Sequence, residues 1–181
     1  LEFVGSVDVY KRQLLTYSVQ QHTDDTHRID TVGFHGLDVC LNAGTTTINI
    51  KDNAHIVSAT GGKYGGAGIG SGSGDTKNDS KKGAVTINIT DGTIEKAEGK
   101  DGGAGIGSGY YGRSSTVNIS GNAELKDVKG GNLAAGIGSG YDSDKVDVVI
   151  DGGTINATGG DSAAGIGSGL NSRSSVTIKS G

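Results

Sequence analysis

Three tyrosines in one part of the sequence are its best candidates for binding chemistry. Tyr110 and Tyr111 directly follow one copy of a short glycine-rich motif, and Tyr141 directly follows the next copy. Aromatic rings that are exposed in a row can stack on sugar rings, so these residues predict a carbohydrate-binding platform. The alternative interpretation is that the rings cover the edge of the fold as hydrophobic shielding.

Two arginines occupy matching places close to these tyrosines. Arg113 and Arg173 each stand just before a pair of serines, and Lys145 is near the equivalent position. Together these cations could attract an acidic polysaccharide. A solvated cationic surface is the alternative, because arginine and lysine are mostly exposed in folded proteins.

Acidic residues gather in two stretches that read as loops. Asp142, Asp144 and Asp147 lie in one of them, and Asp75 and Asp79 lie in the other. Alternating carboxylates suit Ca²⁺, which takes about six to eight oxygen ligands. The spacing matches neither an EF-hand loop nor the calcium-binding nonapeptide repeat. Calcium therefore rests on the carboxylates alone, and the main expectation is that the chain holds no cofactor.

The elements that must position these residues are marked by the hexapeptide AGIGSG. It occurs four times, at residues 67–72, 104–109, 135–140 and 164–169. Two apolar segments precede each copy. The first alternates apolar and polar residues, which is typical of a half-buried strand. The second is shorter, follows a turn signal, and is centred on Ile56, Ile94, Leu125 and Ile155.

Each unit of about 30 residues therefore predicts three short strands and three turns. One unit cannot bury its own apolar side chains, but stacked units can, because each strand would pair with its equivalent about 4.8 Å above it. We expect an all-β fold, a right-handed parallel β-helix of about four coils, with the Ala and Ile of the hexapeptide turned inward. A β-hairpin meander is the runner-up, but it gives no reason for the regular spacing.

The glycines and the outward residues carry further expectations. Glycine costs about 0.5–1 kcal/mol in a regular strand, so its repetition needs a cause. A corner with positive φ, or close approach between coils, would be a structural cause, whereas a bare face for a ligand would be a functional one.

Stacked outward residues predict side-chain ladders along the first strand. These ladders would contain Thr47, Thr86 and Thr116, and Asn49, Asn88 and Asn118.

Composition excludes several classes of protein. The 181 residues carry a net charge of −4, which gives no electrostatic case for nucleic-acid binding. The sequence contains no apolar run of about 18 residues, so we expect no membrane-spanning helix. The single cysteine, Cys40, cannot form an intrachain disulfide, and no histidine stands near a serine or cysteine in a way that predicts a nucleophile.

We expect residues 1–28 to lie outside the repeat domain, which would span residues 29–181. Residues 8–13 resemble a translated adapter used to prepare sequencing libraries, so the leader is interpreted as an assembly scar or a disordered segment. The strand pattern is still in progress at residues 176–178. We therefore expect a piece of a longer protein that has further β-helix coils.

The order strand, turn, strand, glycine pair and AGIGSG, over about residues 37–181, resembles a known group of proteins. These are bacterial secreted or cell-surface proteins with glycine-rich right-handed β-helix repeats, of pectin-lyase-like fold and often described as carbohydrate-binding. The resemblance implies an extracellular or cell-surface location, and a polysaccharide or a host cell-surface glycan as partner.

The enzymes of that fold carry motifs that this sequence lacks. The hydrolases resemble one another in paired aspartates with HG and RIK segments, and the lyases use Asp-bound calcium with an arginine as base. Residues 37–181 contain no such segments, and no acidic triad aligns with Arg113 or Arg173. We therefore expect a non-enzymatic carbohydrate-binding or adhesive module. A fragment of a polysaccharide lyase or glycoside hydrolase and a passive structural stalk are the alternatives.

Overall fold

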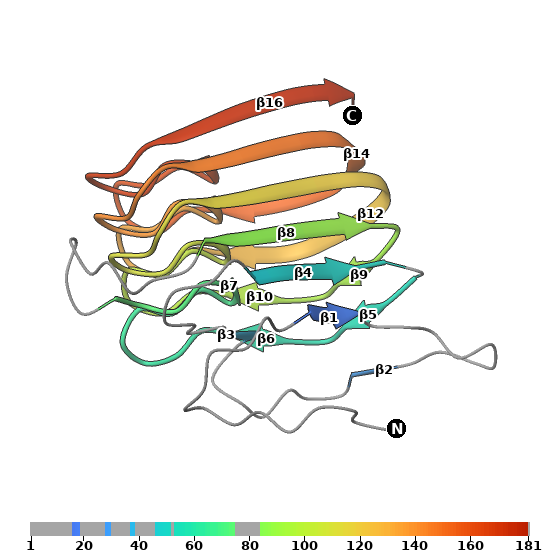
Figure 1. Ribbon diagram of the computed structural model, residues 1–181, viewed down its shortest axis with the longest axis horizontal. Helices are drawn as coiled ribbons and strands as arrows, with labels where there is room; N and C mark the ends of the chain where they lie inside the picture. The colour runs from blue at the N-terminus through green and yellow to red at the C-terminus, as the bar shows by residue number, and fades with distance from the viewer. Residues whose placement is uncertain are drawn as a thin grey trace.

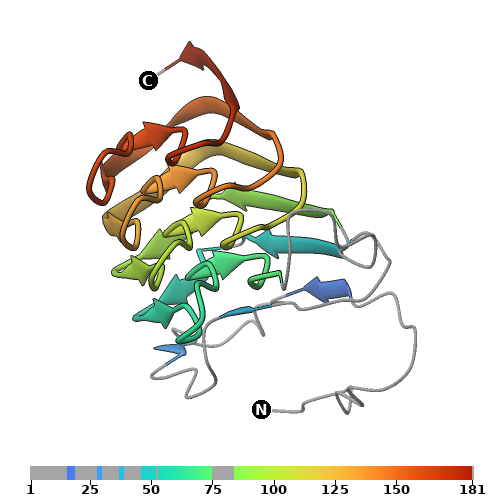
Figure 2. The same cartoon turned by 90° about the vertical axis from the view of Figure 1, so that its left-hand side faces the viewer.

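The protein is a right-handed parallel β-helix. The computed structural model describes residues 46–51, 53–74 and 84–180, together with the backbone of three short strands before them. No helix occurs in these stretches, and all of their strand pairings are parallel (Figures 1 and 2). The predicted fold class is confirmed, with four successive coils that each carry one copy of the hexapeptide.

The first side of the solenoid is built from the alternating segments. Successive strands pair residue for residue, so that Thr47, Thr86 and Thr116 fall into one column. The strands of this side are β1 (Thr16–Ser18), β4 (Thr46–Ile50), β8 (Val85–Thr90), the first part of β12 (Ser115–Lys129), the first part of β14 (Val146–Thr158) and β16 (Ser174–Ser180).

The second side differs from the sequence-based expectation in one respect. In the third and fourth coils β12 and β14 continue without a break from the first side to the second, where two separate strands are predicted. Gly121 has a φ of 64° at the bend of β12, a conformation that glycine adopts without strain. The other strands of this side are β2 (Arg28–Ile29), β5 (His55–Ile56), β6 (Ala59–Thr60), β9 (Thr93–Ile94) and β10 (Ala97–Glu98).

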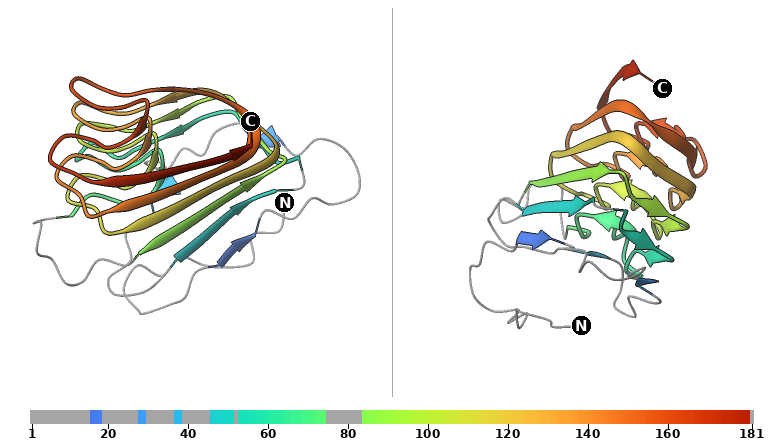
Figure 3. Two further views of the ribbon diagram at one scale, coloured as in Figure 1. Left: turned by 90° about the horizontal axis from the view of Figure 1, so that it is seen from above. Right: turned by 90° about the vertical axis from the view of Figure 1, so that its right-hand side faces the viewer.

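The third side is formed by the hexapeptides. Its strands contain two residues each and stack in the order β15-β13-β11-β7-β3. Figure 3 (left) shows the stacked coils from above. Ile69 pairs with Ile106, Ile106 with Ile137, and Ile137 with Ile166, which confirms the predicted column. These strands are β3 (Leu37–Asp38), β7 (Ile69–Gly70), β11 (Ile106–Gly107), β13 (Ile137–Gly138) and β15 (Ile166–Gly167).

Two of the short strands include residues of the predicted leader, residues 1–28. The backbone of β1 pairs with β4, and that of β2 pairs with β5. β1 lies within residues 1–28 and β2 begins at the last of them. The remainder of that stretch, including residues 8–13, lies outside the described residues.

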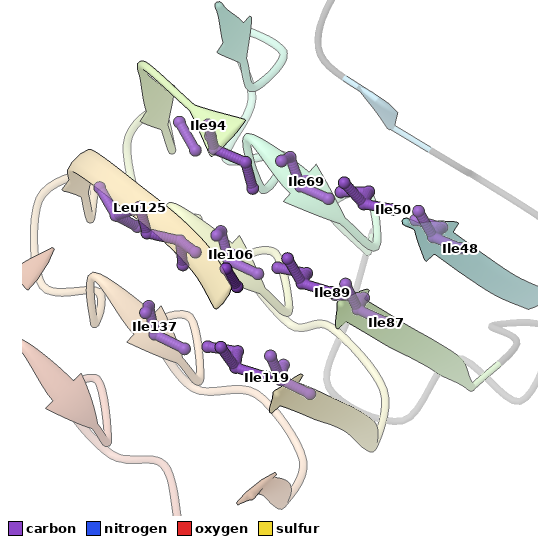
Figure 4. Packing of buried hydrophobic residues seen from close by; sticks show 14 of the residues in the cluster. Ile48, Ile50, Ile69, Ile87, Ile89, Ile94, Ile106, Ile119, Leu125 and Ile137 are labelled. Atoms are coloured by element: carbon purple, nitrogen blue, oxygen red, sulfur yellow. The ribbon is translucent and has the colours of Figure 1, made fainter. Parts of the chain in front are cut away.

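The core between the three sides is mainly aliphatic among the described residues, and Ser115, in the inward column of Val85 and Val146, is buried with it. Isoleucines of all three sides point toward one another, and Ile87, Ile106 and Ile137 are fully buried (Figure 4). The Ala of the hexapeptide is buried in the first three copies, at Ala67, Ala104 and Ala135, but it lies outside the cluster of side chains that forms this core. Burying each isoleucine contributes roughly 1.5–3 kcal/mol, so the stacking of coils supplies the burial that one coil cannot.

The glycine after each hexapeptide isoleucine has a structural cause. Gly107 has a φ of +137°, which L side chains rarely adopt, and its counterparts in the other coils have φ between +134° and +144°. A Cβ atom on Gly107 would lie only 2.0 Å from the carbonyl oxygen of Gly138 in the next coil. Positive φ and close approach between coils therefore act together at this position.

The hexapeptide serine has a role that we did not predict. Ser108 Oγ accepts a hydrogen bond of 3.0 Å from the backbone N–H of Gly140 in the next coil. Ser71 Oγ accepts one of 3.1 Å from the N–H of Gly109. Each serine hydroxyl therefore satisfies a backbone donor that the turn would otherwise leave buried without a partner. The sequence feature that could have predicted this role is the presence of the serine at the same place in all four copies of the hexapeptide.

The predicted asparagine ladder is present on the outer face of the first side. Asn88 Nδ2 donates to Asn49 Oδ1 at 2.8 Å, and Asn118 Nδ2 donates to Asn88 Oδ1 at 2.8 Å. Val149 occupies the next position of the column, so the ladder spans three coils.

Replacing Asn88 with alanine should lower the free energy of unfolding by about 1–2 kcal/mol, because both ladder bonds are lost at once. The converse change, Val149→Asn, extends the ladder toward the fourth coil and should stabilise the protein by up to about 1 kcal/mol. Chemical denaturation followed by circular dichroism measures both values. If both variants unfold like the parent protein, the ladder does not contribute to stability.

Candidate functional site

The two turns that flank the third side lie next to each other and form one edge along the solenoid, which we call the turn edge (Figure 2). Its leading turns, before the hexapeptide strand, are residues 62–65, 100–103, 131–134 and 160–163. Its trailing turns, after that strand, are residues 72–74, 109–112, 140–143 and 169–172. Backbone bonds from Tyr110 N–H to Gly65 O, at 2.8 Å, and from Tyr141 N–H to Gly102 O, at 2.7 Å, join the two rows.

The three predicted tyrosines come together on this edge. The rings of Tyr110 and Tyr141 stack with centroids 5.2 Å apart and an angle of 23° between their planes. Tyr111 lies against Tyr110 at 4.1 Å, tilted by 52°. All three are half-buried. Because the rings face one another, they offer mainly their edges and hydroxyl groups to a ligand.

The tyrosine stack also covers backbone, as the shielding alternative predicts. A Cβ atom on Gly102 would lie 2.5 Å from Cδ2 of Tyr110 and 2.9 Å from Cβ of Tyr141. The glycine of the leading turn thus makes room for the rings. A hydrogen bond with Tyr111 and the partial desolvation of the ring raise the pKa of Tyr110 to about 12, so its phenol is neutral at physiological pH.

Tyr64 is a further aromatic residue of the turn edge that we did not single out from the sequence. Its side chain is 78% exposed, and Lys63 Nζ lies 5.9 Å from the centre of its ring. The sequence feature that could have identified Tyr64 is its place three residues before a hexapeptide. Asp101, Asn132 and Asp161 hold the same place in the other coils. These four residues hold the same place relative to the hexapeptide and all are exposed, and we call them the outermost column of the leading turns.

The turn edge holds most of the strained backbone. Eight non-glycine residues of the described part have positive φ, and all but Asn53 and Asp91 lie on this edge. Positive φ is uncommon for large side chains. The six residues at the edge are Asp101, Tyr111, Leu133, Asp142, Ser162 and Asn171. In the trailing turns Tyr111, Asp142 and Asn171 hold the same position after the hexapeptide, so the same conformation recurs there while the side chain changes.

The structure places the three predicted cations just before strands of the first side. Arg113 is half-buried just before β12, and Arg173 is exposed just before β16. Lys145 precedes β14, which lies between these strands, and its Nζ contacts Asp147 Oδ1 at 2.6 Å. The cations therefore lie at the starts of successive strands, beside the turn edge.

The predicted calcium ligands are not brought together. Asp142 and Asp144 lie at the turn before β14, whereas Asp147 lies in β14 and is paired with Lys145. Among the residues that the structure describes, no three His, Cys, Asp or Glu side chains approach closely enough to hold a metal ion. Asp75, Asp79 and Cys40 lie outside these residues.

The second side carries ion pairs between coils. Glu95 Oε1 lies 2.9 Å from His55 Nε2 in the coil below and 3.0 Å from Lys126 Nζ in the coil above. Hydrogen bonds from Lys126 and His55 lower the pKa of Glu95. These groups sit on an exposed face, so we interpret them as a solvated network that links coils.

Stacked parallel coils with one hexapeptide each define a parallel β-solenoid as the class of protein. Residues 48–73, 87–110 and 148–170 match the family model described as "Beta helix repeat", and this match and the stacked parallel strands together support a β-helix repeat protein. The coil of residues 115–140, between the matched segments, shares their strand register. Neither a curated protein nor a solved structure matches the chain. The described residues contain no helix that is long and apolar enough to cross a membrane.

Proposed function

We propose that the chain is a non-enzymatic module of an extracellular bacterial protein, and that its turn edge binds carbohydrate. The observation that carries this proposal is the placement of the aromatic residues. Tyr64, Tyr110, Tyr111 and Tyr141 are the only aromatic Phe, Tyr or Trp side chains in the described residues, and all four lie on the turn edge. None of them contributes to the core, which is filled by aliphatic side chains.

A role in stability alone does not account for this placement. Tyr64 is 78% exposed, and its partner is the exposed Lys63, a contact worth about 0.5–1 kcal/mol. Tyrosine is the side chain that offers a large rigid surface and a polar tip at low entropic cost. An exposed tyrosine beside three half-buried ones therefore supports a recognition surface.

The backbone of the turn edge supports the same proposal. Equivalent backbone bonds join the trailing turns to the leading turns, from Tyr110, Tyr141 and Leu170 N–H to Gly65, Gly102 and Leu133 O, while the exposed side chains vary from coil to coil. Residues with positive φ that persist in a fold are enriched at binding sites. A constant scaffold with variable tips is suited to recognition, and tyrosine hydroxyls, amides and carboxylates suit the hydroxyl groups of a glycan.

Binding of the purified chain to a glycan array tests the proposal, with Tyr64→Ala as the informative variant. We expect at least one glycan to bind, and the variant to bind it about tenfold more weakly. The fold should tolerate the change, because substitutions at exposed positions usually alter stability by less than about 0.5 kcal/mol.

The matched control is Asn122→Ala. Asn122 is equally exposed, but it lies within β12, beside the bend at Gly121 and away from the turn edge. The Asn122→Ala variant should bind glycans with the same affinity as the parent chain. Absence of binding to every glycan would contradict the proposal and favour a structural stalk, whereas cleavage of a bound polysaccharide would favour the enzyme alternative.

A further inference from the structure

We propose that the ligand of the turn edge is a linear, uncharged glycan that runs parallel to the solenoid axis, with one sugar unit against each coil. This inference rests on the proposed function and specifies the class of its ligand. It follows from the direction, the chemistry and the charge of the exposed turn residues.

The direction follows from the register of the third side. β7, β11, β13 and β15 pair residue for residue, so equivalent turn residues recur without lateral shift. Tyr110 and Tyr141 follow the hexapeptide in successive coils, and the centroids of their stacked rings are 5.2 Å apart. A polymer whose units are about as long as the coil spacing of about 4.8 Å can repeat one contact on each coil.

The chemistry of the outermost column suits sugar units. Going along the axis, the column presents an aromatic ring, a carboxylate, an amide and a second carboxylate, from Tyr64, Asp101, Asn132 and Asp161. The carboxylates accept hydrogen bonds from sugar hydroxyls, and the amide both donates and accepts them. The exposed ring of Tyr64 can pack against the apolar face of a sugar.

The charge of this column favours an uncharged ligand. Asp101 and Asp161 are exposed in two of the four coils, and Asp142 lies in the neighbouring trailing row. The cations of the leading turns, Lys63 and Lys100, lie in the first two coils only, and Lys100 is paired with Glu98. A polyanionic chain along the axis would pass these carboxylates in turn, and such like-charge contacts are unfavourable. The acidic polysaccharide suggested by Arg113 and Arg173 is therefore the less suitable ligand for this edge.

The residue-for-residue stacking of β7, β11, β13 and β15 favours an extended chain. A β-1,4-linked glucan is an extended ribbon and can follow the turns over four coils, whereas an α-1,4-linked glucan coils and leaves the line after a few units. Cello-oligosaccharides should therefore bind better than malto-oligosaccharides of equal length.

Titration calorimetry of the chain with cello-oligosaccharides of two to six units tests this inference. We expect affinity to rise about tenfold or more from two to four units and to level off beyond four, the number of hexapeptide coils. Malto-oligosaccharides and oligogalacturonates of the same lengths should bind more weakly. Tyr64→Ala, which removes the contact at one end of the row, should weaken the four-unit ligand about tenfold.

Equal affinity for the two-unit and six-unit ligands, or tighter binding of malto-oligosaccharides or oligogalacturonates, would overturn this inference. If the chain nevertheless binds a glycan on the array and Tyr64→Ala weakens that binding, the proposed function stands. If no glycan binds in either experiment, the proposed function fails together with the inference.

Discussion

Replacing Gly107 with alanine should destabilise the protein by about 3–5 kcal/mol, because the substitution combines backbone strain with a steric clash. Gly107 has a φ of +137° at the end of β11. The added Cβ would lie 2.0 Å from the carbonyl oxygen of Gly138 and 2.9 Å from its carbonyl carbon. Both atoms belong to the backbone of the next coil, so a rotamer change cannot relieve the contact.

Gly167→Ala is a matched control that separates the two causes. Gly167 has the same φ of +137°, but the nearest atom of the described residues to its added Cβ is Ala164 Cβ, at 3.3 Å. We expect this variant to lose about 1–3 kcal/mol, the strain contribution alone. Urea denaturation of both variants gives the difference. Equal losses would show that the coils can move apart and that close approach does not explain the glycine.

Replacing Ile119 with alanine should cost about 2–5 kcal/mol, because the side chain is lost from a core that is closed on all sides. Ile119 is 1% exposed in the middle of the first side, where β12 pairs with β8 below and β14 above. In a solenoid each coil contacts only its neighbours, so the cavity weakens the interfaces on both sides of the third coil. Chemical denaturation measures the loss.

Ile178→Ala is the control for this prediction. Ile178 lies in the same column of the first side, in β16, but it is 67% exposed. Its replacement should cost less than about 1 kcal/mol. If the two variants lose similar stability, the burial that we assign to the stacked coils is not what holds the protein together.

The sequence alone determined the fold and the inward columns. Alternation over residues 46–50 and its equivalents specified strands with one buried face, since a period of two places every second side chain on the same side. The repeat length then left stacking as the way to bury these faces. The isoleucine column of the hexapeptides and the asparagine ladder follow from the same logic, and both are confirmed.

The local sequence pattern of apolar residues and turn signals did not determine how the first and second strands of a coil are joined. Separate first and second strands were predicted in every coil, but β12 and β14 run through the bend. The bend needs a local conformation, such as the positive φ of Gly121, and the pairing of β12 with β14 shifts register there while the strand itself continues. Turn signals in a sequence indicate where the direction changes, but pairing with the coils above and below decides whether the strand is interrupted.

The tertiary structure decided which residues make up the candidate site and how their side chains are arranged. Tyr110, Tyr111 and Tyr141 could be chosen from their place after the hexapeptide, but the stacking that turns their edges outward appears only in three dimensions. Tyr64 lies 46 residues before Tyr110 in sequence, yet the bond from Tyr110 N–H to Gly65 O places it on the same edge.

The same distinction applies to the carboxylates and the serines. Proximity in sequence suggested that Asp142, Asp144 and Asp147 converge, but Asp147 lies in a strand and pairs with Lys145. Ser108 was left without a role because its partners belong to the following coil. A repeating sequence specifies which positions are equivalent, and hence the fold. Contacts between neighbouring coils join residues about 30 apart, so the tertiary structure decided which side chains form the turn edge.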